Sequence, residues 1–446
     1  MPGKRAGAVL CAALLTFCGQ ISAGWGEPST LVFPTPEHTW GIRKARAVHL
    51  FMFVGLRTRF DNPQGLTAVR LRSWDDPGTE DDDDELVVYG VNSGQNNIIW
   101  NTSMTGIGVF GDHLLDRPGG IAADPEGHVW VADTGNHRLV HLFNPGDRLI
   151  YRGAVGDSGS GPGRFRSPSD VAVDARGRIY VSDTGNARIQ IFAPDGRLLR
   201  MIQADLENPR GIAVIDDQEP WSYYRDSFLC IADRDGRRLI KLSLEGRLLA
   251  VADDRQTVWE RALYGYPAID YYGNIWVTDR DNHCVHKFDR NLNYIVSFGR
   301  RGNGPGEFQS PRGLTIWRRF GQVFVAEENG AQYYWIGIDL LDVEVASNPA
   351  GSGWMIRFLL TERGYVTVEV LDQEGSPVVL LVSNRQMSSG PHDVRWDGRR
   401  SGGGSLPEGL YTVRMKAEPT YSSYHYFHKT VERPITLLPC HRSGRE

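Results

Sequence analysis

The chain has 446 residues, of which 41% are hydrophobic and 10% aromatic, and it contains 51 glycines and 24 prolines. This composition allows a sizeable core and many turns, so it excludes extended disorder and fits an all-β chain with one large and one small domain. The formal net charge of −5, without a Lys/Arg cluster interleaved with aromatic residues, disfavours nucleic acid as a partner.

The N-terminal residues have the pattern of a secretory signal peptide. Lys4 and Arg5 precede the apolar run Ala6–Phe17, and small residues at 22–24 offer a cleavage site. The alternative is a short membrane anchor, but the run is shorter than the roughly 20 residues that a spanning helix needs. We therefore expect residues 1–23 to be a signal peptide. The mature chain would be exported to the periplasm, the cell surface or the extracellular space, without a transmembrane segment.

A repeated pattern dominates the chain from residue 62 onward. Its plainest copies begin at Arg117, with RPGGIAADPEGHVWVADTGNHRLVHLF, and at Ser167, with SPSDVAVDARGRIYVSDTGNARIQIFAPDG. Weaker copies follow at 208, 266 and 310, and a degenerate one precedes them at 62. The acid that ends the second predicted strand stands at Asp133, Asp183, Asp233, Asp279 and Glu327. Steps of 46 to 50 residues between these acids, with apolar strings of period 2, predict radially arranged β units rather than a helical solenoid.

Each copy contains the apolar strings of a four-stranded unit. In the copy from Arg117 we predict an inner strand at Ile121–Ala123, a second at Val129–Val131, a third at Leu139–Leu142 and an outer strand at Arg148–Gly153. A proline precedes each predicted inner strand, at positions 63, 118, 168, 209, 267 and 311. Proline enforces an extended entry there and removes no hydrogen bond from the sheet. Six prolines predict six units.

The last copy shows only three strands before Asp339, whereas the apolar string His49–Val54 has no partner in its own copy. We predict that His49–Val54 is a strand that pairs with Tyr333–Ile338, so that both ends of the repeat region close one ring. Such closure removes two exposed strand edges, which otherwise promote aggregation.

These motifs resemble the NHL-repeat family. The resemblance rests above all on ADTGNHRLVHL at Ala132–Leu142 and SDTGNARIQIF at Ser182–Phe192. It implies a six-bladed β-propeller over residues 45–340. The first copy departs most, because it lacks an acid matching Asp133 and carries the insertion Asp75–Glu85.

The pattern changes after Asp339. We predict short strands without the repeat motif at Trp354–Leu360, Tyr365–Val370, Val378–Val382, His392–Trp396, Leu410–Ala417 and Phe427–Val431. The string GPHDVRWDGRRSGGGSLPEGLYTVRMKA from Gly390 to Ala417 resembles the immunoglobulin-like domain of the flagellar hook-capping protein FlgD. The resemblance implies that an immunoglobulin-like β-sandwich over residues 342–436 follows the propeller as a spacer or attachment module.

The repeated acids and arginines, such as Asp133 with Arg138 and Asp183 with Arg188, could serve as catalytic acids and substrate clamps. Because they occur once per copy, we interpret them instead as structural pairs that tie adjacent units together through charge-assisted hydrogen bonds.

Catalysis with a bound metal has little support in the sequence. The resemblance implies that amidating lyases with this repeat hold zinc through a histidine just after the blade proline. The corresponding positions here are Gln64, Gly119, Ser169, Arg210, Ala268 and Arg312. His137 and His283 fall instead in the turn before the third strand, and the mature cysteines Cys230, Cys284 and Cys440 lack metal-type spacing. We expect no metal and no cofactor.

Carboxylates leave calcium as an alternative. The run Asp81–Glu85 suits calcium, although consecutive acids without ordered spacing are more often a solvated loop. If Asp170, Glu327 and Glu328 approach the channel, they could support a metal-assisted lactone hydrolase.

We expect a non-catalytic exported platform that binds a protein, peptide or glycan on one face of the propeller. Arg210 and Arg312, which follow the proline near the channel mouth, are the predicted ligand contacts, because two guanidiniums can hold an anionic group. The first alternative is a propeller enzyme of the lyase or lactone-hydrolase type with its site at the central channel. The second is RNA binding, which export and the acidic charge disfavour. The fold alone does not decide between these functions.

Overall fold

The computed structural model describes residues 28–35, 43–74, 86–103, 106–111, 113–203, 205–253, 261–347, 353–400 and 402–437. Within these ranges the fold is nearly all β, with a single α-helix, α1 (Ala47–Val54). No helix in the described part of the chain has the length and apolar character needed to cross a membrane. The predicted signal peptide and the acidic run Asp81–Glu85 lie outside the described residues.

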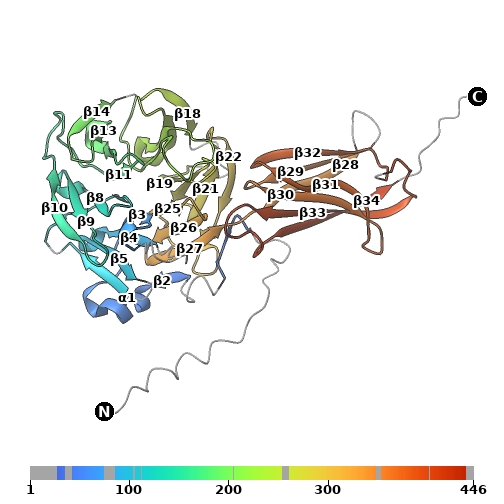
Figure 1. Cartoon of the computed structure of the whole chain (residues 1–446), viewed down its shortest axis with the longest axis horizontal. Helices are drawn as coiled ribbons and strands as arrows, with labels where there is room; N and C mark the ends of the chain where they lie inside the picture. Colours follow the sequence, from blue (N-terminus) through green and yellow to red (C-terminus); the bar gives the residue numbers. More distant parts are fainter. Residues whose placement is uncertain are drawn as a thin grey trace, which may run out of the picture.

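Five consecutive segments each form a four-stranded antiparallel sheet, and these sheets lie around a common centre (Figure 1). The first sheet contains β3 (Pro63–Val69), β4 (Val87–Asn92), β5 (Asn97–Ser103) and β6 (Gly106–Phe110). The second contains β7 (Ile121–Ala123), β8 (His128–Asp133), β9 (Arg138–Phe143) and β10 (Ile150–Val155). The third contains β11 (Asp170–Val173), β12 (Ile179–Asp183), β13 (Arg188–Phe192) and β14 (Leu198–Ile202). The fourth contains β15 (Ile212–Ile215), β16 (Phe228–Asp233), β17 (Arg238–Leu242) and β18 (Leu248–Asp253). The fifth contains β19 (Tyr264–Ile269), β20 (Ile275–Asp279), β21 (Cys284–Phe288) and β22 (Tyr294–Phe298).

The sixth sheet combines the two ends of the repeat region. It contains β25 (Leu314–Trp317), β26 (Gln322–Glu327) and β27 (Gly330–Ile336), and the N-terminal strands β1 (Leu31–Val32) and β2 (Lys44–Arg46) both pair with β27. Leu31 lies opposite Ile336, and Lys44 lies opposite Gln332. A short parallel pair, β23 (Arg300–Arg301) with β24 (Glu307–Phe308), precedes this sheet.

The predicted strand at His49–Val54 is wrong. These residues lie in α1, of which only Leu50 is buried, and the N-terminal segment pairs with β27 through residues 31–32 and 44–46 instead. A short run of consecutive apolar residues has neither period 2 nor period 3.6, so such a run does not distinguish a strand from a helix.

The inner strands bring neighbouring sheets together. β3, β7, β11, β15, β19 and β25 contact one another in this order, and β25 contacts β3. Apolar side chains fill the space between neighbouring sheets, as where Val91 and Trp100 of the first sheet pack with Val131 and Val140 of the second. Close approach requires glycine at Gly120, where a Cβ atom would lie 1.7 Å from Asp170 Oδ1.

Pro63 is the first residue of β3 rather than preceding it. Pro267 does not precede its inner strand either, contrary to the prediction. It lies inside β19 and pairs with Val277, as Val171 pairs with Val181 in the third sheet. The counterpart of Arg210 and Arg312 in the fifth sheet is therefore Gly265 rather than Ala268. Proline is tolerated here because β19 is the innermost strand, with one unpaired edge and a register shift before Pro267.

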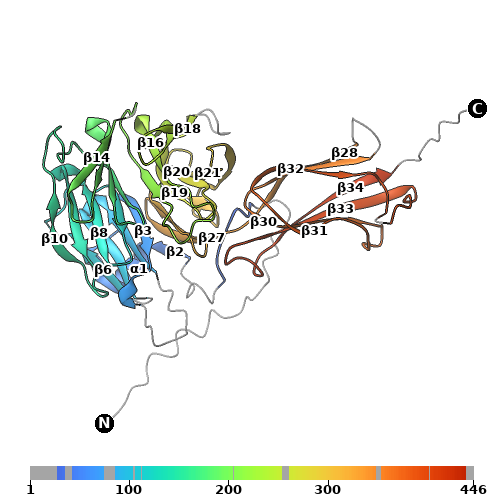
Figure 2. The ribbon, with the colours of Figure 1, turned by 45° about the horizontal axis from the view of Figure 1, so that its top comes forward.

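The C-terminal region contains two antiparallel sheets that form two layers (Figure 2). One contains β28 (Leu340–Ser347), β29 (Trp354–Leu360) and β32 (Gly390–Trp396). The other contains β30 (Gly364–Leu371), β31 (Pro377–Met387), β33 (Gly409–Pro419) and β34 (Lys429–Leu437). Ile356 and Trp396 of one sheet and Val368 and Val413 of the other belong to one core. The six strands predicted in this region are present, although the prediction at 427–431 covers only the start of β34, and β28 was missed.

This region packs against the fifth and sixth sheets. Lys287 Nζ donates to Glu362 Oε2 at 2.5 Å and to Thr361 O at 2.6 Å, and both charged side chains are almost fully buried. Ser423 Oγ donates to Ile336 O, and Tyr421 joins the hydrophobic cluster of the fifth and sixth sheets. A buried ion pair at this contact fixes the C-terminal region on the repeat region.

Candidate functional site

The repeated acid–arginine pairs are occupied by structural contacts. In the third sheet, Arg188 Nε donates to Asp183 Oδ2 at 2.7 Å, and Asp183 is fully buried. The remaining nitrogens of Arg188 donate to the carbonyls of Ser160, Gly161 and Arg164, at 2.8 to 2.9 Å. The pair lies within one sheet and holds the loop that leads into it. Arg138 and Arg238 make equivalent pairs in the second and fourth sheets.

The turn histidines are also structural. His137 and His283 each adopt a left-handed backbone conformation, with φ of 56° and 57°. Their Nδ1 atoms accept the backbone N–H groups of Ser167 and Ser310, each at 2.9 Å. Each histidine therefore orders the entry to the following sheet.

The two arginines chosen from the sequence differ in their surroundings. Arg210 is exposed, and its guanidinium bonds Asp235 Oδ1 through Nε at 3.1 Å and Nη2 at 2.9 Å. Arg312 is half-buried, its Nη1 donates to Asn62 Oδ1, and its buried Nε has no hydrogen-bond partner among the described residues. Burial, and next the charge of Arg280, lower the pKa of Arg312 from its usual range.

One equivalent position in each inner strand lies next to the inner strand of a neighbouring sheet, and its residue type differs between the sheets. Glycine occupies it in four sheets, while the third sheet has Asp170 and the fifth has Tyr266; the glycines are Gly65, Gly120, Gly211 and Gly313. Asp170 Oδ1 accepts the N–H of Val171 and its Oδ2 accepts the N–H of Ile212, each at 2.8 Å. Burial raises the pKa of Asp170 to about 8.

The charges of both predicted arginines act on the phenol of Tyr266. Burial raises the pKa of this phenol above its usual range, Asp170 raises it further, and the charges of Arg210 and Arg312 lower it. Its hydroxyl lies 3.4 Å from Gln64 Oε1 of the first sheet. Gln64 Nε2 in turn donates to Asn62 Oδ1 at 3.0 Å, the oxygen that Arg312 also contacts. Tyr266 thus contacts Gln64 and is affected by the charges of Asp170, Arg210 and Arg312. This residue was missed because the fifth copy was aligned on Pro267.

The carboxylates proposed for the channel do not form one group. Glu327 is 2% exposed and pairs with Lys44 Nζ at 2.9 Å, whereas the charge of Glu328 acts on Arg312. In the described part of the chain, the one set of three metal-type ligand atoms within 4.8 Å of one another belongs to Asp279, Cys284 and His286. The sequence interpretation missed this set, although Cys284 stands where the second to fourth copies have arginine.

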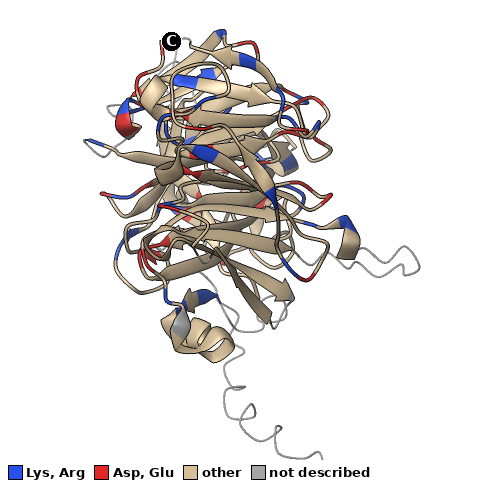
Figure 3. Cartoon of the chain, turned by 90° about the vertical axis from the view of Figure 1, so that its left-hand side faces the viewer, with Lys and Arg blue, Asp and Glu red and all other residues tan. Residues whose placement is uncertain are grey.

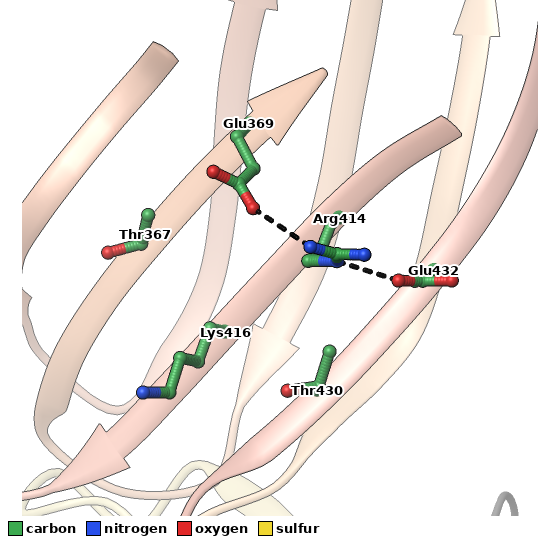
Figure 4. A pocket seen from close by; sticks show the side chains of 6 residues that line it. All are labelled: Thr367, Glu369, Arg414, Lys416, Thr430 and Glu432. Atoms are coloured by element: carbon green, nitrogen blue, oxygen red, sulfur yellow. Dashed lines mark hydrogen bonds and ion pairs between the residues drawn. The ribbon is translucent and has the colours of Figure 1, made fainter. Parts of the chain in front are cut away.

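A pocket on the C-terminal region carries paired charges (Figure 4). It is lined by Thr367, Glu369, Arg414, Lys416, Thr430 and Glu432. Arg414 lies between two carboxylates, with Nη1 3.4 Å from Glu369 and Nε 2.7 Å from Glu432. Because its central cation is already satisfied, this pocket is a weaker anion site than the surroundings of Arg312.

The charged residues of the repeat region are mixed in sign. Ribbon segments with Lys or Arg and segments with Asp or Glu are interspersed over this side of the molecule (Figure 3). This mixture matches the near-balanced composition of 49 basic and 54 acidic residues.

Known proteins match the two regions separately. The family model of the NHL repeat matches residues 115–142 and 165–192, and that of the FlgD Ig-like domain matches residues 358–420. No curated protein matches the sequence.

Solved structures are similar in fold at low identity. A streptogramin B lyase has 14% identity and a TM-score of 0.43 over 63% of this chain and 95% of that chain. A gluconolactonase from Xanthomonas campestris has 15% identity and a TM-score of 0.42 over 70% and 98%. PorZ, a surface component of the type-IX secretion system of Porphyromonas gingivalis, has 12% identity and a TM-score of 0.39 over 79% and 58%. The family models thus identify two NHL repeats in this chain, followed by a FlgD Ig-like domain.

Proposed function

We propose that the six sheets are the blades of one propeller over residues 45–340, and that residues 342–436 form an immunoglobulin-like sandwich. The propeller is supported by the unbroken circle of contacts from β3 through β25 and back to β3. The sandwich is supported by the single core that its two sheets share and by the FlgD Ig-like match.

The function that we propose is a non-catalytic exported platform, which binds an anionic group of a protein, peptide or glycan at the end of the channel near Tyr266. The observation that carries it is the half-buried Arg312 guanidinium, whose buried Nε has no hydrogen-bond partner in the part of the chain that the structure describes. Arg210 adds a second positive charge that acts on the same phenol. A partly desolvated guanidinium gains most from a carboxylate or sulfate, since charge-assisted hydrogen bonds are the strong ones.

The test is binding of the purified mature protein to immobilised acidic peptides and uronate-containing glycans. We expect one class to bind the wild type and to bind the Arg210→Gln/Arg312→Gln variant at least about tenfold more weakly, which corresponds to about 1.4 kcal/mol. Arg117→Gln is the matched control, because Arg117 is an exposed arginine of the equivalent entry loop and sits 3.6 Å from Asp116. Equal binding by the double variant would remove the site.

Export and surface location are supported by the FlgD Ig-like match. Cell fractionation followed by N-terminal sequencing should find the protein outside the cytoplasm, beginning after residue 23. An intact N-terminus in the cytoplasm would contradict this part of the proposal.

One observation favours the enzymatic alternative enough to test it. The pKa of Asp170, raised to about 8 by burial, keeps this carboxyl protonated near neutral pH, as a general acid requires. However, both of its oxygens accept backbone N–H groups. Turnover of aldonolactones by the wild type and its loss in Asp170→Asn, with binding intact, would replace the platform by a lactone hydrolase.

A further inference from the structure

Most of the buried acids that end the second strands have a permanent cation. An arginine of the third strand neutralises this acid in the second, third and fourth sheets. In the sixth sheet the cation is Lys44 of the N-terminal strand β2, 2.9 Å from Glu327. The first sheet has Asn92 at this place, which carries no charge and needs no cation.

The fifth sheet is the exception. Asp279 is fully buried, but Cys284 occupies the place of Arg188, and His286 occupies that of Gln190. His286 Nε2 lies 3.0 Å from Asp279 Oδ2 and 3.7 Å from Cys284 Sγ. A carboxylate, a thiol and an imidazole, all without solvent exposure, thus converge where the related sheets hold a guanidinium.

We propose that Asp279, Cys284 and His286 bind one divalent transition metal ion of the zinc type, which replaces the missing arginine as the counter-charge. Zinc accepts this mixture of oxygen, sulfur and nitrogen ligands. The charges also balance: a carboxylate and a thiolate neutralise a dication, as one carboxylate neutralises one guanidinium in the related sheets. In the alternative without a metal, an imidazolium at His286 would neutralise Asp279, but the Cys284 thiol would then have no role in the charge balance.

The separations of the ligand atoms suit such an ion. Zinc bonds of about 2.0 to 2.3 Å at tetrahedral angles place a nitrogen and an oxygen ligand about 3.3 Å apart, and a nitrogen and a sulfur ligand about 3.6 Å apart. The observed separations are 3.0 Å and 3.7 Å. Small side-chain adjustments therefore suffice to admit the ion.

Outer contacts orient two of the ligands. His286 Nδ1 lies 2.7 Å from Ser297 Oγ, so the second ring nitrogen has a partner when Nε2 is bound to a metal. Asp279 Oδ1 accepts the backbone N–H groups of Asp281 and Asn282, each at 3.1 Å, while Oδ2 accepts the Asn282 side-chain amide at 2.7 Å and faces His286. Such second contacts are usual around metal-binding histidines and carboxylates.

Binding has a defined proton balance. Without an ion, a buried thiol keeps its proton, because burial disfavours the thiolate. The ion displaces the thiol proton of Cys284, which leaves to solvent. The single N–H proton of the neutral His286 imidazole then resides on Nδ1, which faces Ser297. One proton is released for each ion bound.

The place of this site in the fold indicates a structural role. His286 is followed in β21 by Lys287, whose ammonium forms the buried pair with Glu362 of the C-terminal region. The ion would therefore fix the strand that anchors the C-terminal region. This inference does not depend on ligand binding at Tyr266.

The test uses the full mature chain, reconstituted with Co²⁺ and separately with Zn²⁺. We expect one ion per chain, a thiolate-to-cobalt charge-transfer band in the near-ultraviolet, and a lower melting temperature after a chelator. A double variant, Cys230→Ser/Cys440→Ser, leaves Cys284 as the one cysteine beyond the predicted signal peptide and should keep the band. Cys284→Ser should lose it.

A second variant guards against misfolding of Cys284→Ser. Cys284→Arg/His286→Gln copies the third sheet, where Arg188 and Gln190 both bond Asp183. It should fold, bind no ion and melt at the same temperature with or without chelator. A folded wild type without the band would overturn the proposal, as would a band that persists in Cys284→Ser; the counter-charge would then be a protonated His286.

Discussion

The third and fifth sheets have the same strand order, yet they differ at several positions that make specific contacts. The third has Asp170 at the centre, Arg188 beside its buried acid and the apolar Ile191 on the adjoining strand position. The fifth has Tyr266, Cys284 and Lys287 there. Residues shared by the copies hold the strands and loops, whereas those that differ make contacts found once among the described residues. Departures from a repeat are therefore the places to search for function.

The largest expected loss of stability follows from a substitution in the third sheet. Arg188→Met leaves Asp183 buried without its cation, so the free energy of unfolding should fall by about 3 to 5 kcal/mol. Urea denaturation measures this change. The exposed Arg197 gives the control Arg197→Met, which should change stability by less than about 0.5 kcal/mol. A loss below about 1 kcal/mol for Arg188→Met would mean that the repeated pair does not stabilise the fold.

The corresponding change in the fifth sheet tests the contact with the C-terminal region. Lys287→Met leaves Glu362 buried without a cation and should cost about 3 kcal/mol at pH 8. The loss should be smaller at pH 5, because the pKa of Glu362, already raised to about 7 by burial, places its neutral form there. The double variant Lys287→Met/Glu362→Leu should recover most of the loss, since apolar pairs replace buried ion pairs well. Equal losses in the single and double variants would show that packing of Lys287, rather than its charge, matters.

The smallest expected effect on stability concerns Asp170 of the inner strand β11, and it depends on pH. The folded-state pKa of Asp170, about 8, exceeds its ordinary value of 3.8, so the folded protein holds a proton that the unfolded chain releases. Its contribution to stability is complete below the ordinary pKa and is lost as the pH rises toward 8. Between pH 5 and pH 7 the wild type should lose up to about 1.4 kcal/mol per pH unit more than Asp170→Gly, which carries the residue of four other sheets. Parallel pH profiles from thermal melts would contradict this assignment.

The sequence predicts the regular part of the fold well, because alternating apolar residues and turn glycines repeat with few exceptions. The inner strand Ile121–Ala123 was predicted to the residue. Errors arose where one signal was used alone. An apolar run placed a strand at His49–Val54, and a proline count displaced the fifth copy, although Asp270 follows Pro267 by three residues where Asp174 follows Pro168 by six.

The candidate sites were less accessible to sequence reasoning. Cys284 and His286 could have been found by aligning the copies, since both replace residues that the third copy uses to bond its acid. The pair of Lys287 and Glu362 could not, because it depends on how the C-terminal region docks. Likewise, the unpartnered Nε of Arg312 follows from packing against the first sheet rather than from any motif.

The pairing of β1 and β2 with β27 has a consequence for how the molecule is made. Leu31 leaves the ribosome about 300 residues before its partner Ile336. Contacts so distant in sequence form slowly, because the entropy of closing the loop precedes any gain from the contact. Until then β27 keeps an open edge, to which a strand of another chain can add. A polypeptide that lacks either the N-terminal strands or β27 cannot form this pairing. Its sheet edge stays open, so proteases can degrade such a fragment more readily than the full chain.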